Sequence, residues 1–421
     1  MRTLKHITFI ILTILLWLAF IAYGFIEGFL LRPITAQKSS EAFIEATKEK
    51  IDKEFVGNFG MVLIENGEVA DDYFYSIDEP VDQNTLFPVA SISKWVTSFG
   101  VIKLVEQGQL DLDEPVDHFL TRWNLPPSEF DNEKVTIRRL LSHSSGLVDG
   151  LGYAGFKPDE KVQTIEESLT KAADAPYAEG VAKVGYEPGS RYEYSGAGYT
   201  ILQLLIEEVT GQSFQEYMLQ EVLEPLGMKN STFVLSQRPN ADLAQIFKDD
   251  GTTRQMNKFT ALAAASLFTS TADLSKFLKA NVTDNKVLAK ESISKMSTAE
   301  TFINNIGVYG LGPDLYSQND KNSNIIGHDG SGNNAINTAA RIDLVSKNGI
   351  IILETGNYNM ASSLADEWMF WTAGIADYVV MQRNIPYLVT LFVVGCIVIF
   401  TIAILIIRNK NKKRKQLTIT F

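Results

Sequence analysis

The sequence is poor in the residues that build disulfides and metal centres. It has 1 cysteine and 4 histidines among 421 residues. The cysteine, Cys396, lies in a long apolar run, so the rest of the chain can form neither an internal disulfide nor a cysteine-based metal site. No paired metal-ligand spacing relates the four histidines, which are His6, His118, His143 and His328. The sequence therefore predicts a protein that uses no metal or other cofactor.

Positive charge is also scarce in the long middle region of the chain. Of 38 Lys and Arg residues, 2 precede the first apolar run and 6 follow the second, whereas Glu27 alone of the 50 acidic residues lies outside the middle. The middle region therefore carries a formal charge of about −19, which argues against nucleic acid as a partner.

Two uncharged apolar runs lie near the ends of the chain, at residues 7–26 and 385–407. At about 1.5 Å per residue, each is long enough to cross a hydrocarbon core of about 30 Å. Basic residues on the outer sides of both runs predict that both termini are cytoplasmic and that the middle lies outside, in contact with the cell envelope and membrane lipid. A cleaved signal peptide is the alternative for the first run. Its length and the lack of a small-x-small cleavage site favour an uncleaved anchor.

These features divide the chain into four parts. We expect an N-terminal transmembrane anchor, an extracytoplasmic domain, a second transmembrane helix and a basic cytoplasmic tail, at 1–31, 32–384, 385–407 and 408–421. A polar helical stalk is expected at about 33–55, leading into the domain.

The middle region has strand signals at both ends and helix signals between them. Asn66-Gly67 separates two apolar runs and predicts a tight antiparallel hairpin; Lys347-Asn348-Gly349 gives a second. Helical periodicity covers residues 201–209 and 214–223, and a capping signal at Ser270 starts a helix through Lys279. The pattern predicts an α+β domain, with an antiparallel sheet flanked by helices and a mainly helical region.

The strongest chemical signal is Ser91 followed three residues later by Lys94. Lys94 is the only charged residue between Phe87 and Ile102. The three-residue offset places both side chains on one helical face. Burial disfavours the charged form of lysine, so Lys94 can accept the Ser91 proton and make the serine a nucleophile.

Two observations weigh against that hypothesis. A lysine can also extend its amine to water from a core helix. The Ser-x-x-Lys pattern also occurs at Ser168/Lys171 and Ser292/Lys295, where charged neighbours indicate solvated helix faces.

Two glycine-rich stretches support a site around Ser91. The first runs from residue 188 to 199 and contains Tyr194, Ser195 and Gly196. The second runs from 325 to 332 and contains His328-Asp329-Gly330-Ser331; backbone N–H groups there could stabilise an oxyanion.

Together these motifs resemble the serine β-lactamase and penicillin-binding protein family, in the branch of class C β-lactamases, D-aminopeptidases and related esterases. The resemblance covers roughly residues 42–376 and includes signature-like stretches at 135–147, 198–211 and 267–274. It implies the β-lactamase/DD-peptidase-like fold. His143 lies in the first of these stretches and is interpreted as a buried histidine satisfied by backbone hydrogen bonds.

The resemblance also implies a role for each motif. Ser91 matches the acylated nucleophile, Lys94 its proton-handling partner, and Tyr194 the tyrosine of the Tyr-x-Asn motif, which acts as a base if a nearby cation such as Lys94 favours its phenolate. His328 and Gly330 match the Lys-Thr-Gly motif that binds substrate, and the N–H groups of Ser91 and Ser331 would form the oxyanion hole.

Two positions depart from the family pattern. Gly196 replaces the asparagine of Tyr-x-Asn and supplies no amide to the substrate, and His328 replaces a lysine, so its charge depends on its surroundings. The expected function is that of a membrane-anchored serine hydrolase acting on a cell-envelope peptide, D-amino-acid amide or ester, β-lactam or small ester. A penicillin-binding-type sensor and a non-catalytic envelope protein are the alternatives.

Overall fold

The computed structural model describes residues 2–149, 153–175, 179–317, 323–332 and 335–419. The chain divides into two units, and each is described separately. One comprises residues 39–365, and the other comprises residues 1–38 with 366–421.

An eight-stranded antiparallel sheet forms the centre of unit 39–365, in the order β2-β1-β12-β11-β10-β9-β8-β7. Its strands are β1 (Asn58–Glu65), β2 (Glu68–Ser76), β7 (Thr301–Ile303), β8 (Ile306–Tyr309), β9 (Asp314–Leu315), β10 (Ile325–Gly332), β11 (Ile336–Asp343) and β12 (Gly349–Thr355). Strands from the two ends of the domain meet where β1 pairs with β12. The predicted α+β fold with an antiparallel sheet is confirmed.

Both predicted hairpins are present. Asn66 and Gly67 have φ angles of 53° and 84° at the β1–β2 turn, and Lys347 has a φ of 60° between β11 and β12. Asparagine and glycine adopt such positive φ angles at low cost, so the sequence itself specifies the first turn.

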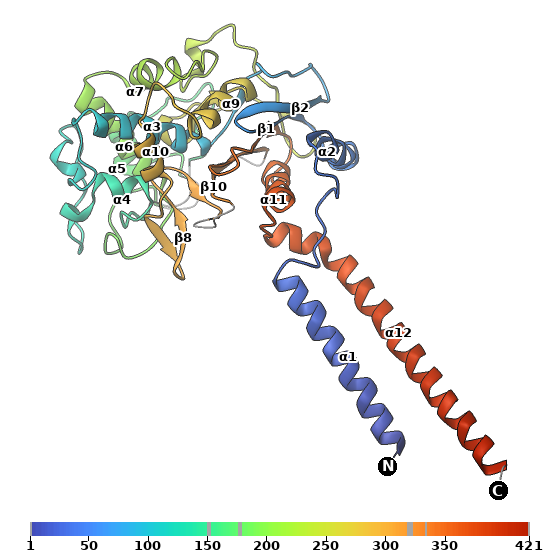
Figure 1. The fold of residues 1–421 in the computed structure, drawn as a ribbon. Coiled ribbons are helices and arrows are strands. Elements are labelled where there is room, and N and C mark those ends of the chain that lie inside the picture. The colour runs from blue at the N-terminus through green and yellow to red at the C-terminus, as the bar shows by residue number, and fades with distance from the viewer. Residues whose placement is uncertain (1, 150–152, 176–178, 318–322, 333–334, 420–421) are drawn as a thin grey trace. The chain divides into compact units, whose positions relative to one another are not determined.

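The helices of this unit are α2 (Ser40–Glu54), α3 (Ile92–Glu106), α4 (Ile137–Leu141), α5 (Ile165–Lys171), α6 (Gly196–Thr210), α7 (Phe214–Met218), α8 (Leu262–Ala265), α9 (Thr271–Ala280) and α10 (Lys290–Met296). Of these, α2 packs against β2, whereas α3 and α9 pack against strands from β1 to β10 on the other face. Alternate residues of β1 face opposite sides: Gly60 approaches Thr271 of α9, whereas Met61 contacts Thr47 of α2. α3 packs on the α9 side, against β10 and β11 (Figure 1).

The polar segment before β1 is helical over a shorter range than predicted. α2 begins after Ser39, whose side chain accepts a hydrogen bond from the N–H of Ala42, and residues 33–39 are not helical. Ser270 caps α9 as predicted, by accepting the N–H of Asp273.

The other unit contains α1 (Arg2–Ile26), α12 (Tyr378–Ile419) and the end of α11 (Met360–Ala373). α1 and α12 pack together; Gly395 makes room for the Trp17 ring, because a Cβ there would lie 2.0 Å from its Nε1. Residues 5–26 and 378–412 are long and apolar enough to cross a membrane.

Candidate active site

Ser91 lies where a short strand turns into the buried helix α3. The strand β3 (Phe87–Pro88) pairs with β6 (Phe268–Thr269). Ala90 then takes a φ of +44°, in the left-handed region that side chains disfavour. Such strain persists only where the surroundings enforce it. Ser91 is the N-cap residue of α3, yet its hydroxyl makes no capping hydrogen bond. The hydroxyl is therefore not committed to the helix end.

Lys94 is buried and points at Ser91. Its exposed fraction is 1%, which contradicts the alternative in which its amine reaches water. Its Nζ lies 3.2 Å from the Ser91 Oγ and donates to the carbonyl of Ala264 at 2.7 Å. Burial lowers the pKa of Lys94 to about 7, although the charges of Asp149 and Asp314 oppose the shift. Lys94 can therefore be a neutral amine, and hence a base, near neutral pH.

Tyr194 reaches the same place from the loop before α6. The Lys94 Nζ lies 5.0 Å from the centroid of the Tyr194 ring. Burial raises the pKa of Tyr194 well above 10, and a hydrogen bond with Ser91 opposes this only in part. The phenol is therefore neutral in the resting protein, and Lys94 is the stronger candidate for the base.

His328 lies on β10 and has an exposed fraction of 2%. Its Nδ1 is 2.6 Å from the Asp329 carbonyl, and its Nε2 is 3.0 Å from the Tyr309 hydroxyl. A carbonyl only accepts, so Nδ1 carries the proton and Nε2 accepts from Tyr309. Burial, assisted by the charge of Lys94, lowers the pKa of His328 to about 4. The imidazole is therefore neutral at physiological pH and supplies no cation for a substrate carboxylate.

Gly330 allows β10 to approach the segment before Ser91. A Cβ at Gly330 would lie 2.2 Å from the Val89 carbonyl oxygen and 2.3 Å from the Thr338 Oγ1. The Thr338 hydroxyl itself donates to the Val89 carbonyl at 3.1 Å. This close contact places Ser331, the next residue of β10, beside the turn that carries Ser91. The oxyanion role of the Ser91 and Ser331 N–H groups stays a prediction.

Gly196, the first residue of α6, faces an aromatic ring. A Cβ there would lie 2.8 Å from the Tyr153 Cε2, and the Tyr153 hydroxyl is 3.2 Å from the Thr200 Oγ1. A ring therefore lies where a side chain at 196 would begin. Our sequence interpretation missed Tyr153, because no motif links it to Gly196.

The other two Ser-x-x-Lys pairs lack a buried lysine. Ser292 is half-buried and Lys295 is exposed on α10, as predicted. The interpretation of Ser168 as a solvated residue is wrong, since its exposed fraction is 2%. Its partner Lys171 is exposed, so only Ser91 has a desolvated amine beside it.

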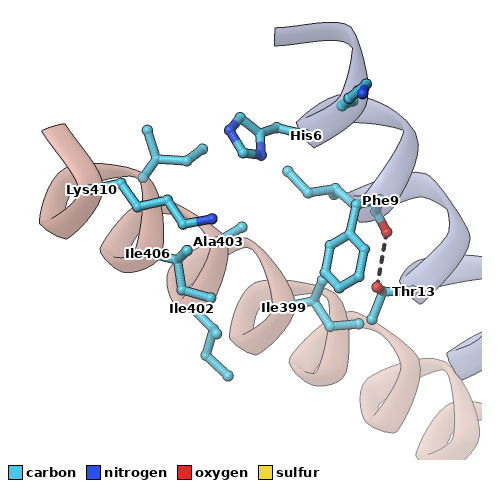
Figure 2. A pocket seen from close by; sticks show the side chains of 11 residues that line it. His6, Phe9, Thr13, Ile399, Ile402, Ala403, Ile406 and Lys410 are labelled. Atoms are coloured by element: carbon cyan, nitrogen blue, oxygen red, sulfur yellow. Dashed lines mark hydrogen bonds between the residues drawn. The ribbon is translucent and has the colours of Figure 1, made fainter. Parts of the chain in front are cut away.

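A separate cavity of about 450 Å³ lies between α1 and α12 (Figure 2). Phe9, Ile399 and Ile402 form apolar walls, whereas Lys5, His6 and Lys410 bring basic groups to the ends of these helices. In the described part of the chain, no group of three or more His, Cys, Asp or Glu side chains could hold a metal ion.

The structure thus brings a serine, a desolvated lysine and a tyrosine together at the start of α3. The family model described as Beta-lactamase matches residues 49–369, so the chain belongs to the Beta-lactamase family of serine hydrolases.

Relatives agree with this assignment. The chain is 36% identical over 160 residues to penicillin-binding protein 4* of Bacillus subtilis, covering 38% of this chain and 33% of that protein. It is 26% identical over 257 residues to protein flp of Staphylococcus aureus, covering 58% and 48%. The chain thus spans a third to a half of these curated relatives. The octameric penicillin-binding protein homologue from Pyrococcus abyssi superposes with a TM-score of 0.66 at 29% identity, covering 79% of this chain and 77% of that one.

Proposed function

We propose that the protein is a membrane-anchored hydrolase that transfers the acyl group of a cell-envelope ester or amide to Ser91 and then to water. The observation that carries this proposal is the 3.2 Å distance between the Ser91 Oγ and the Nζ of a lysine whose pKa is about 7. A nucleophile and its base within hydrogen-bond reach are the signature of covalent catalysis.

Each step has a proton acceptor or donor at hand. The Ser91 oxygen attacks the substrate carbonyl while its proton passes to the neutral amine of Lys94. The N–H groups of Ser91 and Ser331 hold the negative oxygen that forms. When the carbonyl re-forms, the leaving group departs with a proton that passes from the Lys94 ammonium through the Tyr194 hydroxyl. Water then attacks the Ser91 ester, gives a proton to Lys94, and releases the acid; the proton returns to the serine oxygen.

The charges around Ser91 favour a substrate without a carboxylate. His328 is neutral, and the buried guanidinium of Arg341 is already paired with Asp329 at 3.0 Å. Burial raises the pKa of Asp314 to about 8, and this carboxyl offers no positive charge to a substrate carboxylate either. We therefore infer a neutral or amine-bearing ester, or a D-amino-acid amide, in preference to a β-lactam or a peptide with a free C-terminus.

A substrate panel tests this inference. We expect kcat/KM for a nitrophenyl butyrate ester and for D-alanine nitroanilide to exceed that for a chromogenic cephalosporin by about 100-fold. This ratio corresponds to about two charge-assisted hydrogen bonds that the cephalosporin carboxylate would lack in the site. The Ser91→Ala protein measures the background. Faster turnover of the cephalosporin than of either neutral substrate would contradict the inference. A serine adduct that persists for hours with every substrate would instead favour the sensor.

We also propose that α1 and α12 span the membrane, with Lys5, His6 and Lys410 on the cytoplasmic side. The cavity of Figure 2 supports this arrangement, because its basic end would lie among anionic lipid headgroups and its apolar walls among acyl chains.

The single cysteine makes the topology testable. In a Cys396→Ser background, a membrane-impermeant maleimide should label Lys157→Cys in intact cells, since the Lys157 side chain is 73% exposed. Lys412→Cys, five residues after the uncharged run 385–407, should be labelled only after permeabilisation. Labelling of Lys412→Cys in intact cells would overturn the proposed topology, and the background chain without cysteine controls for non-specific reaction.

A further inference from the structure

His143 has no part in the steps above, yet it lies against the site. It follows α4 with a φ of +54° and an exposed fraction of 0%. Histidine is one of the few residues that adopt this conformation with any frequency. Its ring lies among four aromatic rings, with centroid distances from 4.2 to 6.1 Å, which belong to Tyr192, Tyr194, Tyr199 and Tyr309.

Three contacts join His143 to three consecutive residues of the loop that carries Tyr194. The His143 carbonyl accepts the N–H of Glu193 at 2.8 Å. Its ring Nδ1 accepts the N–H of Ser195 at 3.1 Å. Between them, the imidazole packs on the Tyr194 ring with centroids 4.2 Å apart and planes inclined by 37°. The loop is thus held on both sides of Tyr194 and over its ring.

The hydrogen bond from Ser195 fixes the form of the imidazole. Because Nδ1 accepts, the neutral ring carries its proton on Nε2. This Nε2 is buried and has no hydrogen-bond partner among the residues that the structure describes, contrary to the interpretation of His143 as fully satisfied. An unpaired buried donor lowers the free energy of unfolding. We therefore expect the other atoms of His143 to make contacts that offset this cost.

We propose that His143 is the positioning residue of Tyr194: through its carbonyl, its Nδ1 and its ring face, it holds the phenol hydroxyl against Ser91. The inference rests on the proposed function, because it assigns to His143 the geometry of the acyl-transfer step. Protonation of Nδ1 would break the bond from Ser195. Burial lowers the pKa of His143 well below 6.5, so this bond persists across the neutral range.

Two amide substitutions separate the Nδ1 contact from general packing. The Oδ1 of asparagine can replace Nδ1 as the acceptor, and asparagine tolerates a positive φ. The amide of glutamine lies one carbon farther out, near the place of Nε2. In full-length protein, we expect His143→Asn to keep acylation within about 5-fold of the native rate, and His143→Gln and His143→Leu to lose about 100-fold in kcat with little change in KM.

A double-mutant cycle shows whether His143 acts through Tyr194. Turnover of D-alanine nitroanilide, whose amine leaving group needs a proton, is measured and normalised to the amount of folded protein. With Tyr194→Phe already present, His143→Leu should cost less than about 3-fold more, because the group it positions is gone. Equal losses with and without Tyr194, or equal losses in the asparagine and glutamine variants, would overturn the proposal. If a fluorophosphonate probe does not label the native protein at Ser91, the proposed function itself fails, which is a distinguishable outcome.

Discussion

The Ser91→Ala protein should fold normally and lose covalent labelling by a fluorophosphonate probe, together with at least about 10³-fold of its ester turnover. The hydroxyl is the atom that forms the acyl bond, and its oxygen lies 3.2 Å from the Lys94 amine. Alanine removes one oxygen at the N-cap of α3, where no capping hydrogen bond is lost. Intact-mass analysis of the labelled chains gives the result directly.

Ser292→Ala provides the matched control. Ser292 has the same three-residue relation to a lysine, Lys295, but that lysine is exposed. We expect this variant to keep full labelling and turnover. Labelling that survives in Ser91→Ala and disappears in another serine variant would move the nucleophile elsewhere and refute the site.

The Ser91 and Lys94 relation could be predicted from the sequence because it is local. Three residues on one helix fix the distance between the two side chains, and the apolar neighbours already indicated that the lysine would be desolvated. The same periodic argument could have found the burial of Ser168, since it shares a helical face with Ile165 and Leu169. The interpretation of Ser168 as solvated failed because it relied on the charged neighbours in the sequence and not on the apolar residues of its own helical face.

Long-range properties of the site could not be predicted in the same way. Tyr194 lies 100 residues from Lys94 in the chain, and only the resemblance placed them together. The neutral state of His328 follows from burial and from the nearby charge of Lys94, neither of which its own motif contains. The contact of Tyr153 with Gly196 depends on the path of a loop. Packing, rather than residue type, decides these features.

The second large prediction concerns Lys94, because its lowered pKa affects both the activity and the stability of the protein. Acylation needs the neutral amine, so its rate should rise as the pH increases through about 7 and then level off. We expect this single ionisation in kcat/KM for a neutral ester between pH 5.5 and 9. A rate that stays flat over this interval would contradict Lys94 as the base.

The same shift predicts a cost in stability. The folded-state pKa of about 7 lies below the usual 10.5, so the unfolded chain binds more protons between these values. The free energy of unfolding should therefore increase with pH across this window, and the full cost should apply below it. Replacing Lys94 by methionine removes the buried charge but leaves the Ala264 carbonyl without its donor. The gain exceeds that loss, so Lys94→Met should be inactive yet more stable by about 1–3 kcal/mol at pH 7.

Lys103→Met is the control for this comparison, since Lys103 lies on the same helix and also donates to a carbonyl, that of Val287, at 2.9 Å. Its side chain is only half-buried, so its removal should bring no gain. Denaturant unfolding of the three proteins at pH 7 and pH 10 separates the two lysines: the advantage of Lys94→Met should shrink at the higher pH, where native Lys94 is neutral. An advantage that is absent at pH 7, or that grows with pH, would mean that Lys94 is not held in the folded protein as a desolvated amine. Serine activation would then need another base.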